Sequence, residues 1–481
     1  MGEQEPLAVV LARFAAETTF DDLPPEVVDS VRWRVLDILG LCVASQGLPT
    51  SGAIVEYVRD QGGAAQAQVV GGGPDKVPAA QAALANGVLA HSLDYDDTHL
   101  PSVLHPSACV VPAALAAAEV SGADGRELIR AVALGLEICV RIGMAGYDAE
   151  AGNSIFFEHG QHATSICGAL GGAVAAGVLM GLSQDRLLDC LGVAASMASG
   201  LIEANRTGGT VKRLHCGWAA HSAVTAADLV RRGFTGPPTV LEGRFGFFEA
   251  FLRGRFDAKE ITGGLGTEWH VPGIFFKPYP ANHFTHAAVD AAIALREKGL
   301  PPEKVESVTL GVPAPVIRTI GQPIEVKRAP ETGYQAQFSG PYAVAVGLLG
   351  GGGLGAALTD YTDELARDPR RRALMARVEV VADRRCTEIF PMRFPAVLTV
   401  RDTEGRVWRH EVLTNRGGPD RPLSDAELIR KFGDNTAGWL PEDAAATVVR
   451  RVRELEGLPR AAASLLGPLT GLAAAKLEET P

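Results

Sequence analysis

Residues 91–107, HSLDYDDTHLPSVLHPS, contain three of the eleven histidines of the chain and three aspartates. Imidazoles beside carboxylates are the usual composition of a site that takes up and releases protons. The aspartates also have a plainer explanation, because Asp often caps a helix or closes a turn. We assign Asp96 mainly to that structural role. For Asp97 we give the structural role and the acid–base role about equal weight. The stretch is therefore a candidate acid–base site at the start of a helix.

Three further stretches place polar residues among apolar helical patterns: EHGQHATSICGALG (158–171), NRTGGTVKRLHCGWAAHS (205–222) and FFKPYPANHFTH (275–286). Each has a His or Lys at or just before a predicted helix start, where free backbone N–H groups and the helix dipole favour anions. Lys212 lies between glycines and an apolar pattern, which favours a functional lysine over a solvated one. His221 and His270 are interpreted as structural histidines.

A metal site is a competing hypothesis for the first stretch. Asp94, Asp97, His99 and His105 offer the oxygen and imidazole donors that suit a divalent ion. The role of His99 is left open. A G-x-G-x-x-G match in LLGGGGLGAAL is weaker evidence for a functional site, because it follows a helical pattern instead of a strand. We interpret it as a loop that ends a helix. The sequence has no G-x-S-x-G, P-loop or H-E-x-x-H motif.

The composition is that of a globular protein. The chain has 481 residues, 47% of them hydrophobic and 21% charged, and a net charge of −11, so it can form more than one domain. The acidic balance argues against nucleic acid and anionic membranes as partners. The N-terminus lacks the pattern of a signal peptide, and the apolar run 168–182 is too short to span a bilayer, which predicts a cytoplasmic protein. Seven scattered cysteines indicate buried free thiols.

The elements that must position the polar stretches are mostly helices. The pattern changes near residue 267, after which strands are predicted over 305–313 and 377–383 and a hairpin over 396–414. We predict a mainly α fold: a large many-helix domain built from both chain ends, 1–267 and 409–481, with a smaller α+β domain, 268–408, inserted between them. The predicted helices include 24–45, 79–92, 108–120, 125–143, 162–181, 185–198, 217–232, 284–298 and 335–349, with further helices at SDAELIRKF (424–432) and 459–477.

Taken together, HSLDYDDTH…HPS, GQHATSICGALGGAVAAG, GGTVKRLHCGWAAHSAVTAADLVRRGFTGPPTVLEGRFGFF and KPYPANHFTHAAVDA resemble the MmgE/PrpD family. That family includes 2-methylcitrate dehydratase, cis-aconitate decarboxylase and iminodisuccinate epimerase. The resemblance runs in order through nearly the whole chain. It implies that the α+β insertion is a lid domain, that the active site lies between the domains, and that the protein is a homodimer. It also implies catalysis with no metal and no organic cofactor.

The resemblance also implies roles for individual residues, of two kinds. Catalytic roles fall on Asp94, His105, His162 and Lys212, and substrate-binding roles on Thr98, His215 and Lys277. Arg206 and Arg213 are added as further cationic anchors for substrate, and Asn282 stands where the decarboxylases carry a histidine. RTIGQP (318–323) lacks the lid-domain tyrosine of the decarboxylases, and HLPSVL is shorter than the matching segment of the bacterial methylcitrate dehydratases. The substrate is therefore not fixed by the family.

Removing a proton beside a carboxylate places negative charge on that carboxylate, so a positioned base and a fixed cation are needed. His105 or His162 would be base or acid, Asp94 would orient an imidazole, and Lys212 and Lys277 would hold the anion. We expect a lyase that acts on a small di- or tricarboxylate, with dehydration or hydration of a 2-methylcitrate-like hydroxy acid preferred. The alternatives are an epimerase of an iminodisuccinate-like acid, a decarboxylase of a cis-aconitate-like acid, a metal-dependent hydro-lyase and a non-catalytic carboxylate-binding protein.

Overall fold

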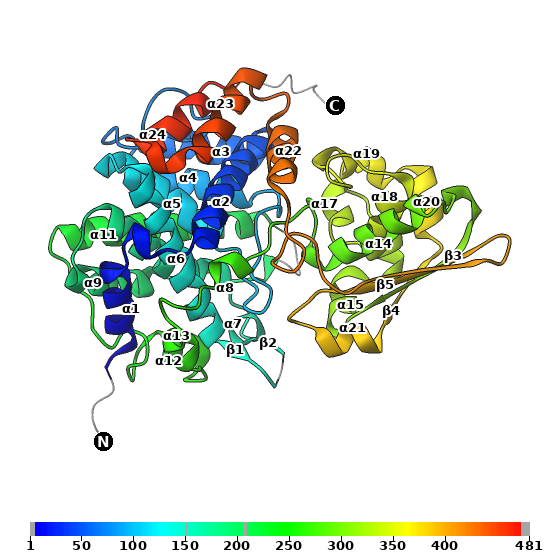
Figure 1. Ribbon diagram of the computed structural model, residues 1–481, viewed down its shortest axis with the longest axis horizontal. Helices are drawn as coiled ribbons and strands as arrows, with labels where there is room; N and C mark the ends of the chain where they lie inside the picture. Colours follow the sequence, from blue (N-terminus) through cyan, green and yellow to red (C-terminus); the bar gives the residue numbers. More distant parts are fainter. Residues whose placement is uncertain (1–4, 151, 205–208, 473–481) are drawn as a thin grey trace. The chain divides into compact units, whose positions relative to one another are not determined.

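The computed structural model describes residues 5–150, 152–204 and 209–472. The chain divides into two compact units (Figure 1). Unit 1 is Met1–Ile274 with Asn435–Pro481, and unit 2 is Phe275–Asp434. These bounds differ from the predicted 267 and 408. The Arg34 guanidinium donates to the carbonyl groups of Val271 and Ile274, which binds that segment to unit 1. Residue 408 lies inside strand β6, whose pairing with β5 keeps it in unit 2.

Unit 1 is built from helices, as the mainly α prediction requires. Its only strands among the described residues are the short antiparallel pair β1 (Tyr147–Asp148) and β2 (Asn153–Ser154). The helices are α1 (Leu7–Glu17), α2 (Pro25–Ala44), α3 (Pro49–Asp60), α4 (Ala79–His91), α5 (Ser107–Ser121), α6 (Gly125–Ala145), α7 (Ile155–Glu158), α8 (Ala163–Leu179), α9 (Gln184–Met197), α11 (Val211–Arg231), α12 (Phe247–Leu252), α13 (Lys259–Thr262), α23 (Glu442–Arg453) and α24 (Ala461–Leu466). Helix α22 (Asp425–Thr436) crosses the boundary between the two units.

Small residues let the central helices of unit 1 approach closely. Helix α11 packs on α4 and α8, and α8 also packs on α5 and α6. A Cβ atom on Gly217 would lie 2.3 Å from the Leu84 carbonyl oxygen, and one on Gly87 would lie 2.7 Å from the Gly217 Cα. Only glycine therefore allows α4 and α11 to cross at this distance. The crossing brings the end of α4 beside the start of α11, where two of the polar stretches lie.

Unit 2 is the α+β part of the chain. Its four-stranded sheet has the order β4 (Val378–Ala382), β3 (Val305–Val312), β5 (Ala396–Asp402), β6 (Val407–Val412), with β3 parallel to β4 and the other pairs antiparallel. Helices α14 (His286–Glu297) and α18 (Gly340–Leu349) lie together on one face of this sheet (Figure 1). The shorter helices are α15 (Ile317–Ile320), α16 (Ile324–Arg328), α17 (Gly333–Ala336), α19 (Asp363–Ala366), α20 (Pro369–Met375) and α21 (Arg384–Ile389).

Helix α11 differs from its prediction in a way that affects the site. It begins at Val211, six residues before the predicted start at 217, because the chain turns at Gly209 with a φ of 108°. Lys212 is thus in the first turn of the helix instead of a loop. Residues three apart on a helix share a face, so Lys212 and His215 point the same way.

Two further observations concern apolar packing. All seven cysteines are buried free thiols, as predicted. Among the described residues, no single helix is both long and apolar enough to cross a membrane, although the bent pair Pro25–Gly47 and Pro49–Asp60 reaches the required length and composition across a 102° bend.

Candidate active site

Polar side chains gather in unit 1 from the end of α4, the loop 92–106 and the starts of α5, α8 and α11. The structure brings together six of the predicted site residues there, and it adds two that were not predicted. All eight have buried or nearly buried side chains. The predicted members are Asp94, Thr98, His105, His162, Lys212 and His215, and the added members are His91 and Asp96.

A backbone carbonyl group orients the His105 ring. Its Nδ1 lies 2.7 Å from the backbone carbonyl oxygen of Asp97, and that oxygen can only accept a hydrogen bond. Nδ1 therefore carries a proton, and in the neutral ring Nε2 is the basic nitrogen. The Thr98 hydroxyl makes a weaker contact with the same Nδ1 at 3.4 Å, and the His105 backbone N–H donates to the Thr164 hydroxyl at 3.1 Å. The tautomer is thus fixed by the loop and the start of α8.

His162 and His215 form a second imidazole pair. Their Nδ1 atoms are 3.1 Å apart, so one ring donates and the other accepts, and the pair cannot hold a proton on both nitrogens. Burial lowers the pKa of His162 well below its usual value, and the charge of His91 lowers it further. Burial and the same neighbour lower the pKa of His215 to about 4. Both rings are therefore neutral at neutral pH.

Lys212 supplies the cation of the cluster. Its Nζ is 2.9 Å from Asp94 Oδ1, and the two side chains are 20% and 9% exposed. The Asp94 backbone has a φ of 51°, a left-handed conformation that costs energy for a residue other than glycine. Asp94 was expected to orient an imidazole, and a carboxylate oxygen of it lies within 4.8 Å of a His105 ring nitrogen. Asp96 lies 2.8 Å from His91 Nδ1. The assignment of Asp96 to a cap or turn is therefore corrected.

A buried ion pair supports the loop that holds His105. Arg34 Nη1 is 2.7 Å from Asp97 Oδ2, and both side chains are almost fully buried. The Asp97 carboxylate also accepts from the Ser107 hydroxyl and, at 3.2 Å, from the Ser107 backbone N–H at the start of α5. Burial raises the pKa of Asp97 and lowers that of Arg34 in spite of their mutual attraction. Asp97 thus has a structural role, and it positions His105 through its own carbonyl group.

Four predicted site residues are not among these eight: Arg206, Arg213, Lys277 and Asn282. Arg213 donates to the Thr50 hydroxyl of α3 at 2.8 Å, and Arg206 lies outside the described residues. Lys277 and Asn282 belong to unit 2: Lys277 is buried, and the Asn282 side-chain oxygen accepts from the Phe284 N–H at 3.1 Å, which caps a short 3₁₀ helix.

The proposed metal ligands do not gather as a set. His99 bonds to Ser102 at 2.7 Å, and burial lowers its pKa to about 3, with His270 as its next titratable neighbour. The group whose ligand atoms lie within 4.8 Å of one another is instead Asp94, Asp96 and His105. Side chains of the protein already face both of these carboxylates: the Lys212 ammonium faces Asp94, and the His91 imidazole faces Asp96.

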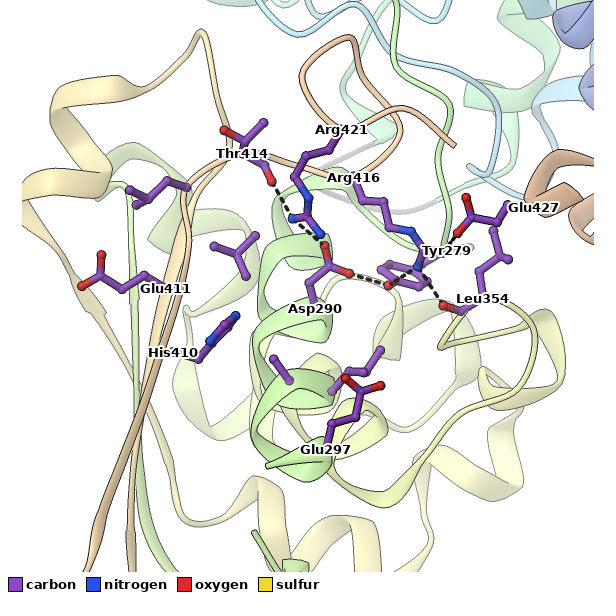
Figure 2. Close-up of a pocket in the computed structure, with 14 residues that line it drawn as sticks. Tyr279, Asp290, Glu297, Leu354, His410, Glu411, Thr414, Arg416, Arg421 and Glu427 are labelled. Carbon is purple, nitrogen blue, oxygen red and sulfur yellow. Dashed lines mark hydrogen bonds and ion pairs between the residues drawn. The ribbon is translucent and has the colours of Figure 1, made fainter. Parts of the chain in front are cut away.

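A pocket of about 900 Å³ lies in unit 2, and none of the predicted site residues is among those that line it (Figure 2). Several of its polar groups contact one another. The Tyr279 hydroxyl donates to Asp290 at 2.5 Å, Arg421 lies 3.4 Å from the same carboxylate, and Arg416 pairs with Glu427. These contacts join α14 to the segment after β6 and give the pocket a structural explanation.

The cluster in unit 1 can therefore take up a proton at His105 Nε2 and stabilise negative charge with Lys212. Its hydrogen bonds are made before any substrate binds, so the groups need little reorganisation during a reaction. His91 and Asp96 were missed because the sequence offers only their spacing of five residues across a helix end. A histidine as the last residue of a helix pattern, followed by carboxylates, was the available signal.

Comparisons with known proteins agree on one family. Residues 9–259 match the family model described as the MmgE/PrpD N-terminal domain, and residues 279–456 match the MmgE/PrpD C-terminal domain. A cis-aconitate decarboxylase of Aspergillus terreus is 30% identical over 292 residues, 58% of each chain. The Homo sapiens cis-aconitate decarboxylase is 30% identical over 410 residues, 81% of this chain and 79% of that protein. The 2-methylcitrate dehydratase of Cupriavidus necator is 28% identical over 278 residues, 55% of each chain. The alignment thus spans less than two thirds of the Aspergillus and Cupriavidus relatives.

Proposed function

The chain belongs to the MmgE/PrpD family, and from this premise we propose that it is a lyase which removes the α-proton of a small di- or tricarboxylate. The specific reaction we propose is dehydration or hydration of a 2-methylcitrate-like hydroxy acid. The observation that carries the proposal is the placement of His105 in a buried cluster with Asp94 and Lys212, where its Nδ1 donates to the Asp97 carbonyl group.

In the proposed reaction, His105 Nε2 takes the proton from the carbon next to a substrate carboxylate. The electrons of the broken C–H bond form the carbon–carbon double bond, and the hydroxyl group leaves from the adjacent carbon as water. The Lys212 ammonium is the group that can give the leaving oxygen its proton, because His162 is neutral at neutral pH. Lys212 also faces the negative charge that develops on the carboxylate, as an ammonium does in other sites that stabilise such charge.

A substrate with two or three carboxylates needs cationic anchors as well as a base. We propose Lys277 as the first of these, because a buried lysine in the KPYP motif is one that the family resemblance implies as a ligand. Arg206 and Arg213 are proposed as further anchors. Thr98 and His215 contact His105 and His162, so they support the proposed acid–base groups.

The test is turnover of citrate-, malate-, cis-aconitate- and iminodisuccinate-like acids, followed by proton NMR in deuterated water. Dehydration, decarboxylation and simple exchange of the α-hydrogen leave different signals. We expect His105→Gln and Lys212→Ala to lower kcat by about 10²–10³ on the true substrate. His221→Gln and Lys259→Ala are matched controls outside the cluster and should retain parental rates. Parental turnover by both cluster variants would refute the proposal.

Decarboxylation of a cis-aconitate-like acid is the second candidate. It is favoured by the match to the Homo sapiens decarboxylase, which covers 81% of this chain. Two features argue against decarboxylation. Asn282, whose side-chain oxygen caps a helix, stands where the decarboxylases carry a histidine, and the RTIGQP segment lacks their tyrosine. Loss of carbon dioxide in the same NMR assay would select this reaction, and α-hydrogen exchange without loss of water would select an epimerase. Binding that raises the Tm with no turnover would indicate a carboxylate-binding protein.

A further inference from the structure

His91 is a buried imidazole that the proposed reaction does not use. We propose that His91, held as an imidazolium by Asp96, is a positioning residue that keeps His105 and His162 neutral and ready to accept a proton. This inference rests on the proposed function, because it assigns His91 a role in the same reaction.

The geometry around His91 favours the charged form. The residue is 3% exposed, Asp96 is 0% exposed, and His91 Nδ1 lies 2.8 Å from Asp96 Oδ2. A buried carboxylate is costly unless a positive charge and hydrogen bonds compensate it. An imidazolium supplies both at this distance. The ring belongs to the last residue of α4, at a helix C-terminus where a positive charge is also favoured.

A count of charges supports the same conclusion. The loop 92–106 places three buried carboxylates close together, and each has a cationic partner if His91 is protonated. Lys212 pairs with Asp94, Arg34 pairs with Asp97, and His91 pairs with Asp96, at 2.9, 2.7 and 2.8 Å. The loop is then electrically balanced without any additional ion.

The position of the ring explains what the charge would do. The ring centroid of His91 lies 5.1 Å from that of His105 and 5.9 Å from that of His162. A positive charge within about 6 Å disfavours protonation of a neighbouring base. Burial by itself lowers the pKa of His91, but the Asp96 carboxylate and, after it, the Cys216 sulfur outweigh burial and raise that pKa to about 10. After burial, the His91 charge is the next cause that lowers the pKa of His162.

Several titratable groups from different parts of unit 1 surround His91. The Cys216 thiol is a further neighbour of the ring: burial opposes its ionisation, but a hydrogen bond from Cys109 and the His91 charge bring its pKa to about 7. The groups are Asp96 from the loop, His105 and Cys109 from the start of α5, His162 from the start of α8, and Lys212, His215 and Cys216 from α11.

The first test is independent of turnover. Histidine-labelled full-length protein is titrated by NMR of the ring nitrogens, which distinguishes an imidazolium from a neutral ring. We expect one ring to stay doubly protonated above pH 8, and its signal to be lost in His91→Gln but retained in the matched control His221→Gln. Asp96→Asn preserves a hydrogen bond without the charge, and should return that ring to titration near or below pH 6.5. In His91→Gln a second histidine should titrate at least about one pH unit higher than in the parent.

Two results in this titration would overturn the inference: no ring that stays protonated above pH 8, or a persistent signal that survives His91→Gln. The Asp96→Asn variant decides the question by itself if His91→Gln does not fold.

The second test uses whichever acid the parent protein turns over. In His91→Gln the acidic limb of kcat/KM should move up by at least about one pH unit, with a tenfold loss at low pH and recovery at high pH. A purely structural role would lower the rate equally at all pH values, and that result would overturn the positioning role. If the parent protein turns over none of the acids, the proposed function fails. The NMR titration still decides whether His91 is charged and whether its charge lowers the proton affinity of His105 and His162.

Discussion

The buried pair of Arg34 and Asp97 gives a quantitative prediction about the support of the site. Asp97→Leu removes the carboxylate and leaves the Arg34 guanidinium, which is 1% exposed, without its anionic partner. Removing one partner of a buried ion pair costs about 3–5 kcal/mol. The two hydrogen bonds from Ser107 to Asp97 belong to the same network, so their loss is already included in that range and is not added to it. We therefore expect the free energy of unfolding to fall by about 3–5 kcal/mol.

The assay is urea unfolding followed by tryptophan fluorescence. Four of the five tryptophans belong to unit 1, so the signal reports mainly on the unit that contains the pair. They are Trp33, Trp218, Trp269 and Trp439. The double variant Arg34→Met/Asp97→Leu removes both charges and should be clearly more stable than Asp97→Leu, because burial of the charges already costs energy in the parent.

Glu5→Gln is the control for this experiment, since the exposed Glu5–Arg13 pair should contribute nothing measurable. The reasoning is refuted if Asp97→Leu unfolds within about 1 kcal/mol of the parent, or if the double variant is less stable than the single one.

Three further predictions concern the same packing. Stability should fall as the pH drops below 6.5, because His99 has a pKa of about 3 in the folded protein and only the unfolded chain takes up its proton in that range. The slope for this one group is up to about 1.4 kcal/mol per pH unit, and acid unfolding of His99→Gln should show a shallower dependence. Gly217→Ala should destabilise the protein and lower turnover, because its Cβ would meet an α4 carbonyl group at 2.3 Å, whereas Gly457→Ala meets nothing within 4 Å and should retain parental stability and rate. All seven thiols should react with a thiol reagent only after denaturation, and rapid reaction of any in the native protein would contradict their burial.

The sequence by itself determined the elements and the kinds of chemistry. Helical periodicity gave the mainly α fold, and strand-like alternation gave the β3, β5 and β6 positions, because these signals depend on residues close together in the chain. The resemblance to one family depended on four separated motifs, and the matches to both halves of the chain confirm it. The prediction placed the start of α11 at 217 instead of Val211, because the charged residues of its first turn have the composition of a loop.

Tertiary structure alone decided which polar groups meet. Asp94, Asp96 and Asp97 are close neighbours in the sequence, yet they face an ammonium, an imidazole and a guanidinium from three different helices. The proton on His105 is placed by a backbone carbonyl group, which no side-chain pattern can reveal. The physical reason is that the partner of a buried charge depends on how helices far apart in the sequence cross, and glycine contacts such as Gly87 with Gly217 set that crossing.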